Sequence, residues 1–366
     1  SRPDINYSRY FFFHVNYLIS SNKKEKAKKI LKSSLDLHPE NLILNQLEVD
    51  LNQKKIFNNQ FDCKDTRHVV AEILYIVANA LTAQQNYSTS NFYLNLATYL
   101  NPNFISFEAL RAKNFFTMNK YNEAKKIYKE VQKYGQVYRW YASKETASIL
   151  IKQEKKKEAI IYVKRIFKKI KNPTTYEMYD YAEFLKNNKI YKEAIEYFSK
   201  VMNTIDKTHD LYGPVLDGRG VAYERSDQWN KAEADLLNSL SVSPDDAYVI
   251  NYLAYTWIEK GINIDKSLNM LKKANALRPN DGYIIDSLGW ALFKLKNYKE
   301  AKKYLQQAVR FMASDPVIND HYADSLWMNN NSLQARYYWN YVLTLEKTEE
   351  KLKKKIKQKL LFGLKI

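Results

Sequence analysis

Cysteine, glycine and proline are scarce in this chain of 366 residues. Cys63 is the single cysteine, so no disulfide can form within the chain, and cysteine usage does not identify the compartment. The 8 glycines and 8 prolines are fewer turn formers than a sheet protein or a disordered chain of this length normally carries. These shortages favour an all-helical fold.

Long hydrophobic runs are also missing. The longest apolar stretches, 10–19 and 71–83, fall short of the ~20 residues that a membrane-spanning helix needs. Asn or His interrupts each, so both are expected to be core helices and no transmembrane segment is predicted. The chain starts at Ser1 rather than at Met, which leaves room for a signal peptide or a lipid anchor at a missing N-terminus.

Sequence motifs of catalysis are absent. The chain has no Gly-rich phosphate loop, no nucleophile elbow and no His-Glu metal motif. Gly218 and Gly220 form the only close glycine pair, and they fall inside a predicted helix. The five histidines lie far apart, and none forms a ligand pair with another His or with Cys63. The sequence therefore predicts no enzyme, no cofactor and no metal site.

Arginine is rare for so basic a chain. The formal net charge is +18, yet only 11 of the 58 basic residues are arginine. Proteins that read nucleic acids favour arginine for bidentate and stacked contacts, so dispersed lysine is expected to cover a solvated outer face. Nucleic acid is therefore the disfavoured partner, and an RNA-binding helical-repeat protein is kept as the alternative function.

A short motif recurs along the chain. It reads Tyr-x-Glu-Ala or a close relative and ends at Ala124, Ala194, Ala232 and Ala301. Small residues repeat with the same period of 34 or 35 at Gly220, Ala254, Gly289 and Ala323, and again at Ala232, Ser267, Ala301 and Ala335. A unit of this length cannot bury its own apolar face, so the period predicts a solenoid of stacked helical hairpins.

The same register extends to both ends of the chain and predicts about ten hairpins. It places helix junctions at Pro244, Pro279 and Pro316, with Asp315 as the N-cap before Pro316. A degenerate unit and a loop are expected around 41–68, and an insertion at 204–209. We expect residues 1–346 to form the solenoid and 347–366 a separate basic amphipathic helix. That helix is expected to cap the open end of the solenoid, and binding to anionic lipid is the alternative.

The hairpin pattern resembles the tetratricopeptide repeat family, which has a small residue at the eighth position and Ala at the twentieth. The stretch 286–301 fits that pattern almost position by position. More narrowly, 251–257, 278–290 and 315–321 look like the C-terminal half of long proteobacterial repeat proteins, including envelope lipoprotein adaptors. The resemblance implies a right-handed α-solenoid, a scaffold or adaptor function, and a periplasmic or envelope location ahead of a cytoplasmic one.

In this family the second, fifth, ninth, twelfth and thirteenth positions of each first helix line a concave groove. The resemblance therefore implies a groove lined by Asp217, Asn251, Tyr255, Asp286, Trp290, Phe293, Asp320, Asp324 and Trp327. Short polar side chains in such a row can bind an extended peptide, and the acidic ones favour neutral or basic segments over a carboxylate. Two alternatives stay open: the polar groups bond neighbouring helices, and the aromatic rings pack between repeats.

Overall fold

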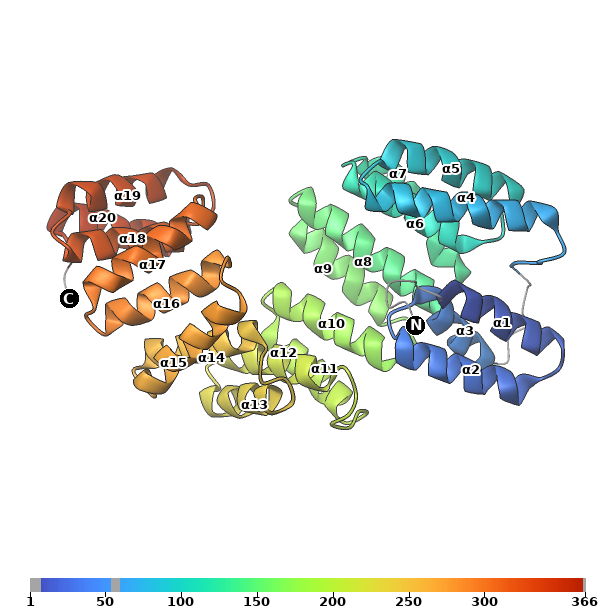
Figure 1. The fold of residues 1–366 in the computed structure, drawn as a ribbon, viewed down its shortest axis with the longest axis horizontal. Helices are drawn as coiled ribbons and strands as arrows, with labels where there is room; N and C mark the ends of the chain where they lie inside the picture. Colours follow the sequence, from blue (N-terminus) through green and yellow to red (C-terminus); the bar gives the residue numbers. More distant parts are fainter. Residues whose placement is uncertain (1–7, 54–59, 365–366) are drawn as a thin grey trace. The chain divides into compact units, whose positions relative to one another are not determined.

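The computed structural model describes residues 8–53 and 60–364, and all regular elements in these ranges are helices. Figure 1 shows them following one another as antiparallel hairpins. The chain divides into two compact units, Ser1–Tyr181 and Ala182–Ile366. The prediction of an all-α repeat fold is confirmed.

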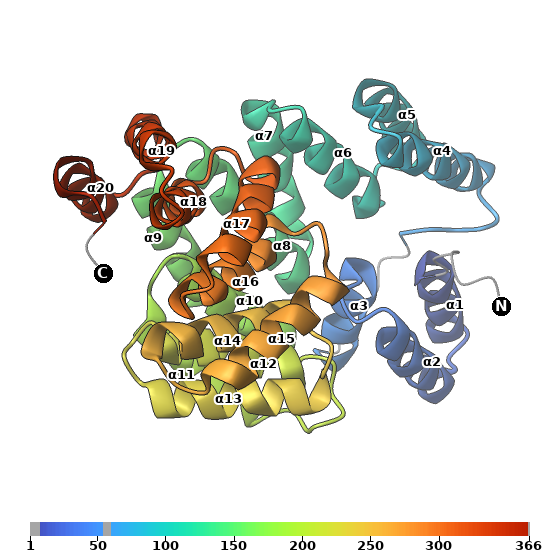
Figure 2. The same cartoon turned by 60° about the vertical axis from the view of Figure 1, so that its left-hand side comes forward.

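Unit 1 contains a hairpin, a single helix and then three more hairpins. The helices are α1 (Ser8–Ser20), α2 (Lys24–Leu37), α3 (Leu42–Asn52), α4 (Thr66–Ala83), α5 (Tyr87–Leu100), α6 (Ile105–Thr117), α7 (Tyr121–Val131), the short 3-10 helix η1 (Gln132–Tyr134), α8 (Gln136–Lys152) and α9 (Lys156–Phe167). Figures 1 and 2 both show α4 and α5 side by side. In each hairpin, the first helix is followed by a second helix that packs against it.

Unit 2 continues the pattern and ends with one extra helix. Its helices are α10 (Thr175–Asn187), which spans the division between the units, α11 (Tyr191–Met202), α12 (Tyr212–Glu224), α13 (Trp229–Val242), α14 (Ala247–Lys260), α15 (Ile264–Leu277), α16 (Gly282–Lys294), α17 (Tyr298–Phe311), α18 (Pro316–Met328), α19 (Ser332–Thr344) and α20 (Glu350–Phe362). The insertion at 204–209 forms turns between α11 and α12.

Small residues stand where two helices of a hairpin approach each other. A Cβ atom added at Gly289 would lie 2.7 Å from Cγ of Leu305 and 3.1 Å from its backbone nitrogen. Ala301 and Ala335 are fully buried in the same core cluster, together with the indole of Trp339. The repeat period therefore marks close helix contacts, as ridges-into-grooves packing requires.

The turns within the hairpins use a left-handed residue in place of glycine. Positive φ angles occur at Asn22, Gln85, Asn119, Glu154, Lys189, Asp227, Asn263, Lys296 and Asn330. Each of these nine residues lies between the first and second helix of one hairpin, so the described residues form nine hairpins rather than about ten. The difference arises at α3, which has no second helix in 60–65; residues 54–59, where the predicted degenerate unit ends, lie outside the described residues.

Helix starts follow the capping chemistry read from the sequence. The side chain of Asp315 accepts hydrogen bonds from the backbone N–H groups of Val317 and Ile318, and Pro316 occupies the first turn of α18. At α4, Asp65 accepts from the N–H of Arg67. The helix thus begins at Thr66, before the end of the range 41–68 in which a degenerate unit and a loop are expected.

Candidate functional site

The predicted groove residues lie on four successive first helices of unit 2. Asp217 is on α12, Asn251 and Tyr255 are on α14, Asp286, Trp290 and Phe293 are on α16, and Asp320, Asp324 and Trp327 are on α18. Their environments differ from one helix to the next. The acidic groups on α16 and α18 have cationic partners, whereas the polar groups on α12 and α14 have none among the described residues.

Asp286 forms a buried ion pair with the next first helix. Nδ1 of His321 on α18 lies 3.0 and 3.1 Å from the two carboxylate oxygens of Asp286. Burial disfavours the charged imidazole, but the charge and hydrogen bond of Asp286 outweigh it and raise the pKa of His321 above its ordinary value. The carboxylate of Asp286 is therefore already engaged within the chain.

Asp320 and Asp324 are held by the C-terminal helix. Nζ of Lys359 on α20 lies 2.7 Å from Oδ1 of Asp320 and 2.8 Å from both oxygens of Asp324. The indole N–H of Trp339 also donates to Asp324 at 3.0 Å. Burial and the neighbouring charge of Asp320 raise the pKa of Asp324 to about 6. These two aspartates therefore bind a neighbouring helix.

α20 packs its apolar side on the last hairpin. Ile356 is fully buried in the same core cluster as Trp339, and Leu352 and Leu360 pack partly against it. Arg336 of α19 donates to the carbonyl of Leu360. This burial supports the capping interpretation of the C-terminal helix, which stays a prediction.

The aromatic residues on α16 form a partly exposed stack. Trp290 lies flat against His321, with ring centres 3.9 Å apart, and against Phe293 at 4.8 Å. Its indole N–H donates to Glu259 at 2.7 Å. Trp290 is half-buried, so its ring serves packing and still presents surface. Packing between repeats, one of the two alternatives, is therefore present, and contact of the exposed part of Trp290 with a partner stays a prediction.

The remaining predicted aromatics are also partly packed. Phe293 meets Tyr298 edge to face, with ring centres 5.2 Å apart, and Trp327 lies 5.3 Å from Trp339. Burial raises the pKa of Tyr255 above its ordinary value, so its hydroxyl stays protonated and can donate or accept a hydrogen bond. All three side chains are intermediate in exposure.

Asp217 and Asn251 carry polar atoms that the described residues do not satisfy. No described residue forms a hydrogen bond or ion pair with the carboxylate of Asp217. Burial raises the pKa of Asp217 to about 6, against the opposing charge of Lys186. Oδ1 of Asn251 is buried without a partner in the described residues. Such acceptors favour a donor from another molecule.

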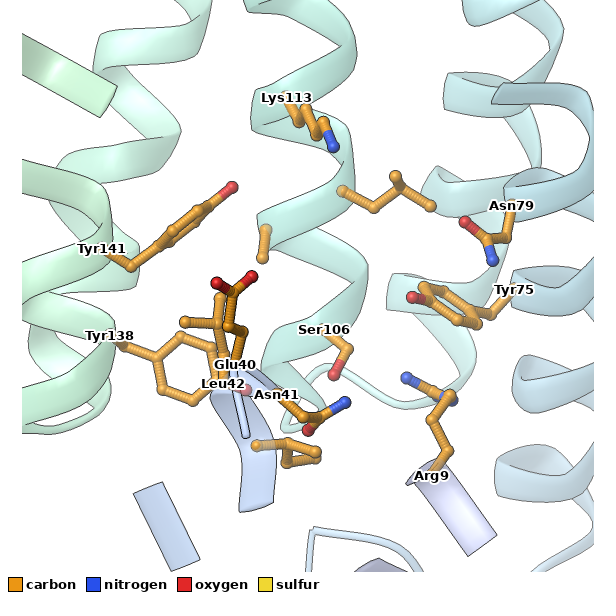
Figure 3. A pocket seen from close by; sticks show the side chains of 13 residues that line it. Arg9, Glu40, Asn41, Leu42, Tyr75, Asn79, Ser106, Lys113, Tyr138 and Tyr141 are labelled. Atoms are coloured by element: carbon orange, nitrogen blue, oxygen red, sulfur yellow. The ribbon is translucent and has the colours of Figure 1, made fainter. Parts of the chain in front are cut away.

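Unit 1 contains a cavity that sequence reasoning did not predict. Its volume is about 330 Å³, and Figure 3 shows the side chains around it. The lining residues are Arg9, Glu40, Asn41, Leu42, Ile43, Tyr75, Asn79, Ser106, Ala109, Leu110, Lys113, Tyr138 and Tyr141. They come from α1, from α3 and the turn before it, and from the first helices α4, α6 and α8.

The repeat register would have found half of this cavity. Counting from the small residues Ala78, Ala112 and Ala147 as eighth positions, the second, fifth and ninth positions include six lining residues. These are Tyr75, Asn79, Ser106, Ala109, Lys113 and Tyr141. The groove predicted from the sequence covers the C-terminal repeats alone, so it does not include this cavity.

Helices from the start of the chain form the other wall of the cavity. Nε of Arg9 donates to Glu72 at 2.7 Å, Nη2 of Arg9 also pairs with Glu72, and the guanidinium lies 3.9 Å from the ring centre of Tyr75. On α3, Oε1 of Gln46 accepts from the backbone N–H of Val137 at 2.9 Å. α1 and α3 therefore contact α4 and the start of α8 within unit 1.

Two further properties bear on function. Among residues 8–53 and 60–364, no three His, Cys, Asp or Glu side chains are grouped so that they could hold a metal ion. Within the same part of the chain, no helix is both long and apolar enough to cross a membrane.

Comparison with known proteins identifies the repeat. A family model described as "Tetratricopeptide repeat" matches residues 285–311. The chain is 27% identical over 129 residues to the TPR repeat-containing protein PA4667 of Pseudomonas aeruginosa, a match that covers 35% of this chain and 21% of that protein. The chain thus spans about a fifth of that relative's length. The family model and this relative confirm the resemblance to the tetratricopeptide repeat family.

Solved structures include similar helical-repeat proteins. A thermophilic TPR protein of Thermus thermophilus, TTC0263, has a TM-score of 0.44 at 15% identity over 52% of this chain and 100% of its own. MamA from Desulfovibrio magneticus has a TM-score of 0.41 at 14% identity over 48% of this chain and 97% of its own.

Proposed function

We propose that this chain, which carries tetratricopeptide repeats, is a non-catalytic scaffold that binds a neutral or basic segment of a partner protein. The repeats support a protein-interaction role in general. The finer proposal is that the partner segment lies along α12, α14 and α16 of unit 2. An envelope or periplasmic adaptor role belongs to the same proposal and is supported by the resemblance alone.

One observation carries the proposal. In unit 1, the inward positions of α4, α6 and α8 line a cavity whose opposite wall is made by α1 and α3 of the same chain. These positions can therefore hold a protein segment. In unit 2, the corresponding positions on α12 and α14 bear Asp217 and Asn251, whose acceptor atoms lack a partner in the described residues.

The contacts within unit 2 favour α12, α14 and the exposed part of Trp290 over α18 as the place where a partner segment binds. Lys359 engages Asp320 and Asp324 on α18, and His321 engages Asp286. A partner segment would have to break these buried pairs in order to bond the same carboxylates, at considerable cost. Asp217, Asn251 and the exposed part of Trp290 are free of that cost.

The chemistry of these groups selects the partner. Asp217 and Oδ1 of Asn251 accept hydrogen bonds, so they suit backbone N–H, Lys or Arg donors. A cation beside Asp217 would stabilise its charged form, which burial disfavours. An acidic segment would be repelled there. Trp290 offers a flat apolar surface, typical of an anchoring contact in an interface.

Binding of defined peptides tests this proposal. The probes are two extended peptides of about 12 residues, alternating Ser with Lys or Ser with Glu, titrated into the full chain at several salt concentrations. We expect the lysine peptide to bind more tightly, and Asp217→Asn to weaken that binding ~5- to 10-fold, which corresponds to the loss of one charge-assisted hydrogen bond. Equal binding of both peptides would sink the proposal.

A matched control distinguishes a local effect of Asp217 on peptide binding from an effect of the net charge of the chain. Asp227→Asn removes the same charge from the same unit, in a turn where Asp227 has a φ of 58° that Asn also tolerates. This control should leave peptide binding unchanged. If both variants weaken binding equally, the peptide responds to net charge and not to α12. The RNA alternative predicts instead an affinity for RNA that falls steeply with salt.

A further inference from the structure

The hairpin of α4 and α5 is almost free of charge. Residues 73–107 contain no Asp, Glu, Lys or Arg, although 27% of the chain is charged. The charged residue on α4 nearest this stretch, Glu72, is paired with Arg9. A solvated outer face normally carries charges, so this hairpin has the composition of a covered surface.

α4 leaves uncovered the side that other first helices bury. Ile73 and Val77 occupy the third and seventh positions of their repeat, and their side chains are 56% and 38% exposed. At the same positions of α16, Ile284 and Leu288 are 0% and 1% exposed. In that repeat, Ala274 of the preceding second helix packs in the same cluster as Ile284.

The missing cover follows from the path of the chain. The helices before α4 do not stack on it as a preceding hairpin. Instead, α1 reaches the other side of α4, where Arg9 pairs with Glu72 and lies over Tyr75. Ile73 lies between these two residues in sequence, on a different side of the helix. The apolar stripe of α4 that would contact a preceding hairpin is therefore exposed. It consists of Val69, Ile73, Ile76 and Val77.

α5 carries a second exposed apolar stripe. Phe92, Leu96 and Tyr99 are the twenty-second, twenty-sixth and twenty-ninth residues of their repeat, and all three are exposed. Two other second helices show the contrast, because they are polar or charged at all three positions. In α7 and the adjoining η1 they are Lys126, Glu130 and Lys133, and in α17 they are Lys303, Gln307 and Arg310.

We propose that this hairpin is the interface with a second copy of the chain, in which α4 of each copy packs on α5 of the other. A two-fold pair uses the same patch twice, with each contact made in both directions. The second copy then covers the apolar stripes of both helices. α4 contacts a second helix, as the other first helices do, and α5 contacts an apolar surface.

Charge favours this place for self-association. Each copy has a formal net charge of +18, so two copies repel each other through most of their surfaces. The α4–α5 hairpin brings no lysine or arginine of its own between 73 and 107 into the contact. For the same reason it has no attraction for the headgroups of anionic lipid.

Sedimentation equilibrium of the full chain tests the inference, with Phe92→Glu and Ile73→Glu as variants. We expect a wild-type dimer, and a dissociation constant raised ~100-fold or more by either change, because each buries an unpaired charge in an apolar contact. Both side chains are exposed in the single chain, so circular dichroism and thermal unfolding of the monomer should stay unchanged. A wild-type chain that is still monomeric at ~100 μM would overturn the inference.

Ile161→Glu is the matched control. Ile161 is exposed on α9 at the same repeat position as Phe92, so it tests whether any exposed isoleucine or phenylalanine supports association. We expect Ile161→Glu to leave the dimer intact. A dimer that survives Phe92→Glu and Ile73→Glu contradicts the inference. So does a monomer that binds neutral phosphatidylcholine vesicles through these residues, since the patch would then face lipid.

Discussion

The two units differ in what contacts the inward positions of their first helices. In unit 1, α1 and α3 lie across α4, α6 and α8, and Arg9 and Gln46 bond residues of those helices. In unit 2, the chain's own contribution comes at the last hairpin, where Lys359 binds two aspartates of α18. A position in the repeat therefore says which way a side chain points, and the neighbouring segment decides whether it is available.

The largest expected loss of stability comes from breaking the contact between Arg9 and Glu72 in unit 1. Arg9→Ala would leave the buried carboxylate of Glu72 without its cation and would remove the guanidinium from the ring of Tyr75. We expect a loss of ~3–5 kcal/mol in the free energy of unfolding, the usual cost of breaking a buried pair. Urea unfolding followed by circular dichroism measures it.

Arg67→Ala is the control for this change. Arg67 pairs with Asp65 at the start of α4, but its side chain is exposed, and exposed pairs contribute little. We expect almost no shift of the unfolding midpoint. If Arg9→Ala costs no more than Arg67→Ala, α1 is not anchored by this pair, and the contrast between the units disappears.

A somewhat smaller effect is expected at the C-terminal helix. Lys359→Ala removes the ammonium group that pairs with both Asp320 and Asp324, and we expect a loss of ~2–4 kcal/mol in the free energy of unfolding at about neutral pH. The cost is below that for Arg9 because Asp324, whose pKa is raised to about 6, can take up a proton. The same measurement at about pH 5 should therefore show a smaller loss. An equal cost at both pH values contradicts the assigned pair.

The smallest expected effect is the pH dependence from His321. Its pKa is raised in the folded chain, so the folded state holds the proton more tightly than the unfolded state does. The stabilisation is complete below the unfolded value of about 6.5 and is lost as the pH rises through the folded pKa. Asp217 and Asp324 act in the same direction, but at lower pH, between their unfolded values and about 6.

Thermal unfolding from about pH 6.5 upward isolates this contribution. The unfolding temperature of the wild type should fall with rising pH, and His321→Gln should make the curve flatter. His14→Gln, which changes an exposed residue of α1, should keep the wild-type slope. A slope that survives His321→Gln would mean that the pair with Asp286 is not what titrates.

The period of small residues was enough to predict the fold. Gly289 lies against Leu305 as the register requires, and Asp315 caps α18 beside Pro316. These features depend on neighbours one helix away, which a local pattern records. α3 was harder to place, because no periodic signal says that a single helix contacts α8 through Gln46 and the N–H of Val137.

The repeat register predicted that the candidate residues lie on first helices, but not which residues they contact. It places Asp286 on α16 and Asp324 on α18, yet it does not give their partners His321 and Lys359. A signal was present, since each partner lies 35 residues after its aspartate, one repeat further on. These ion pairs join unlike residues of successive repeats, so a comparison of equal repeat positions does not reveal them.

The left-handed turns have a consequence for how this chain can change. Nine hairpins of the described residues turn through a residue with positive φ that is not glycine, and for Lys, Glu or Gln this conformation costs ~1 kcal/mol. Lys189, Lys296 and Glu154 are thus sites where glycine would relieve strain without touching an inward position or the α4–α5 hairpin. If a new recognition residue lowers the stability of a repeat, a glycine in the turn of the same repeat can restore it. Recognition and stability can therefore evolve separately.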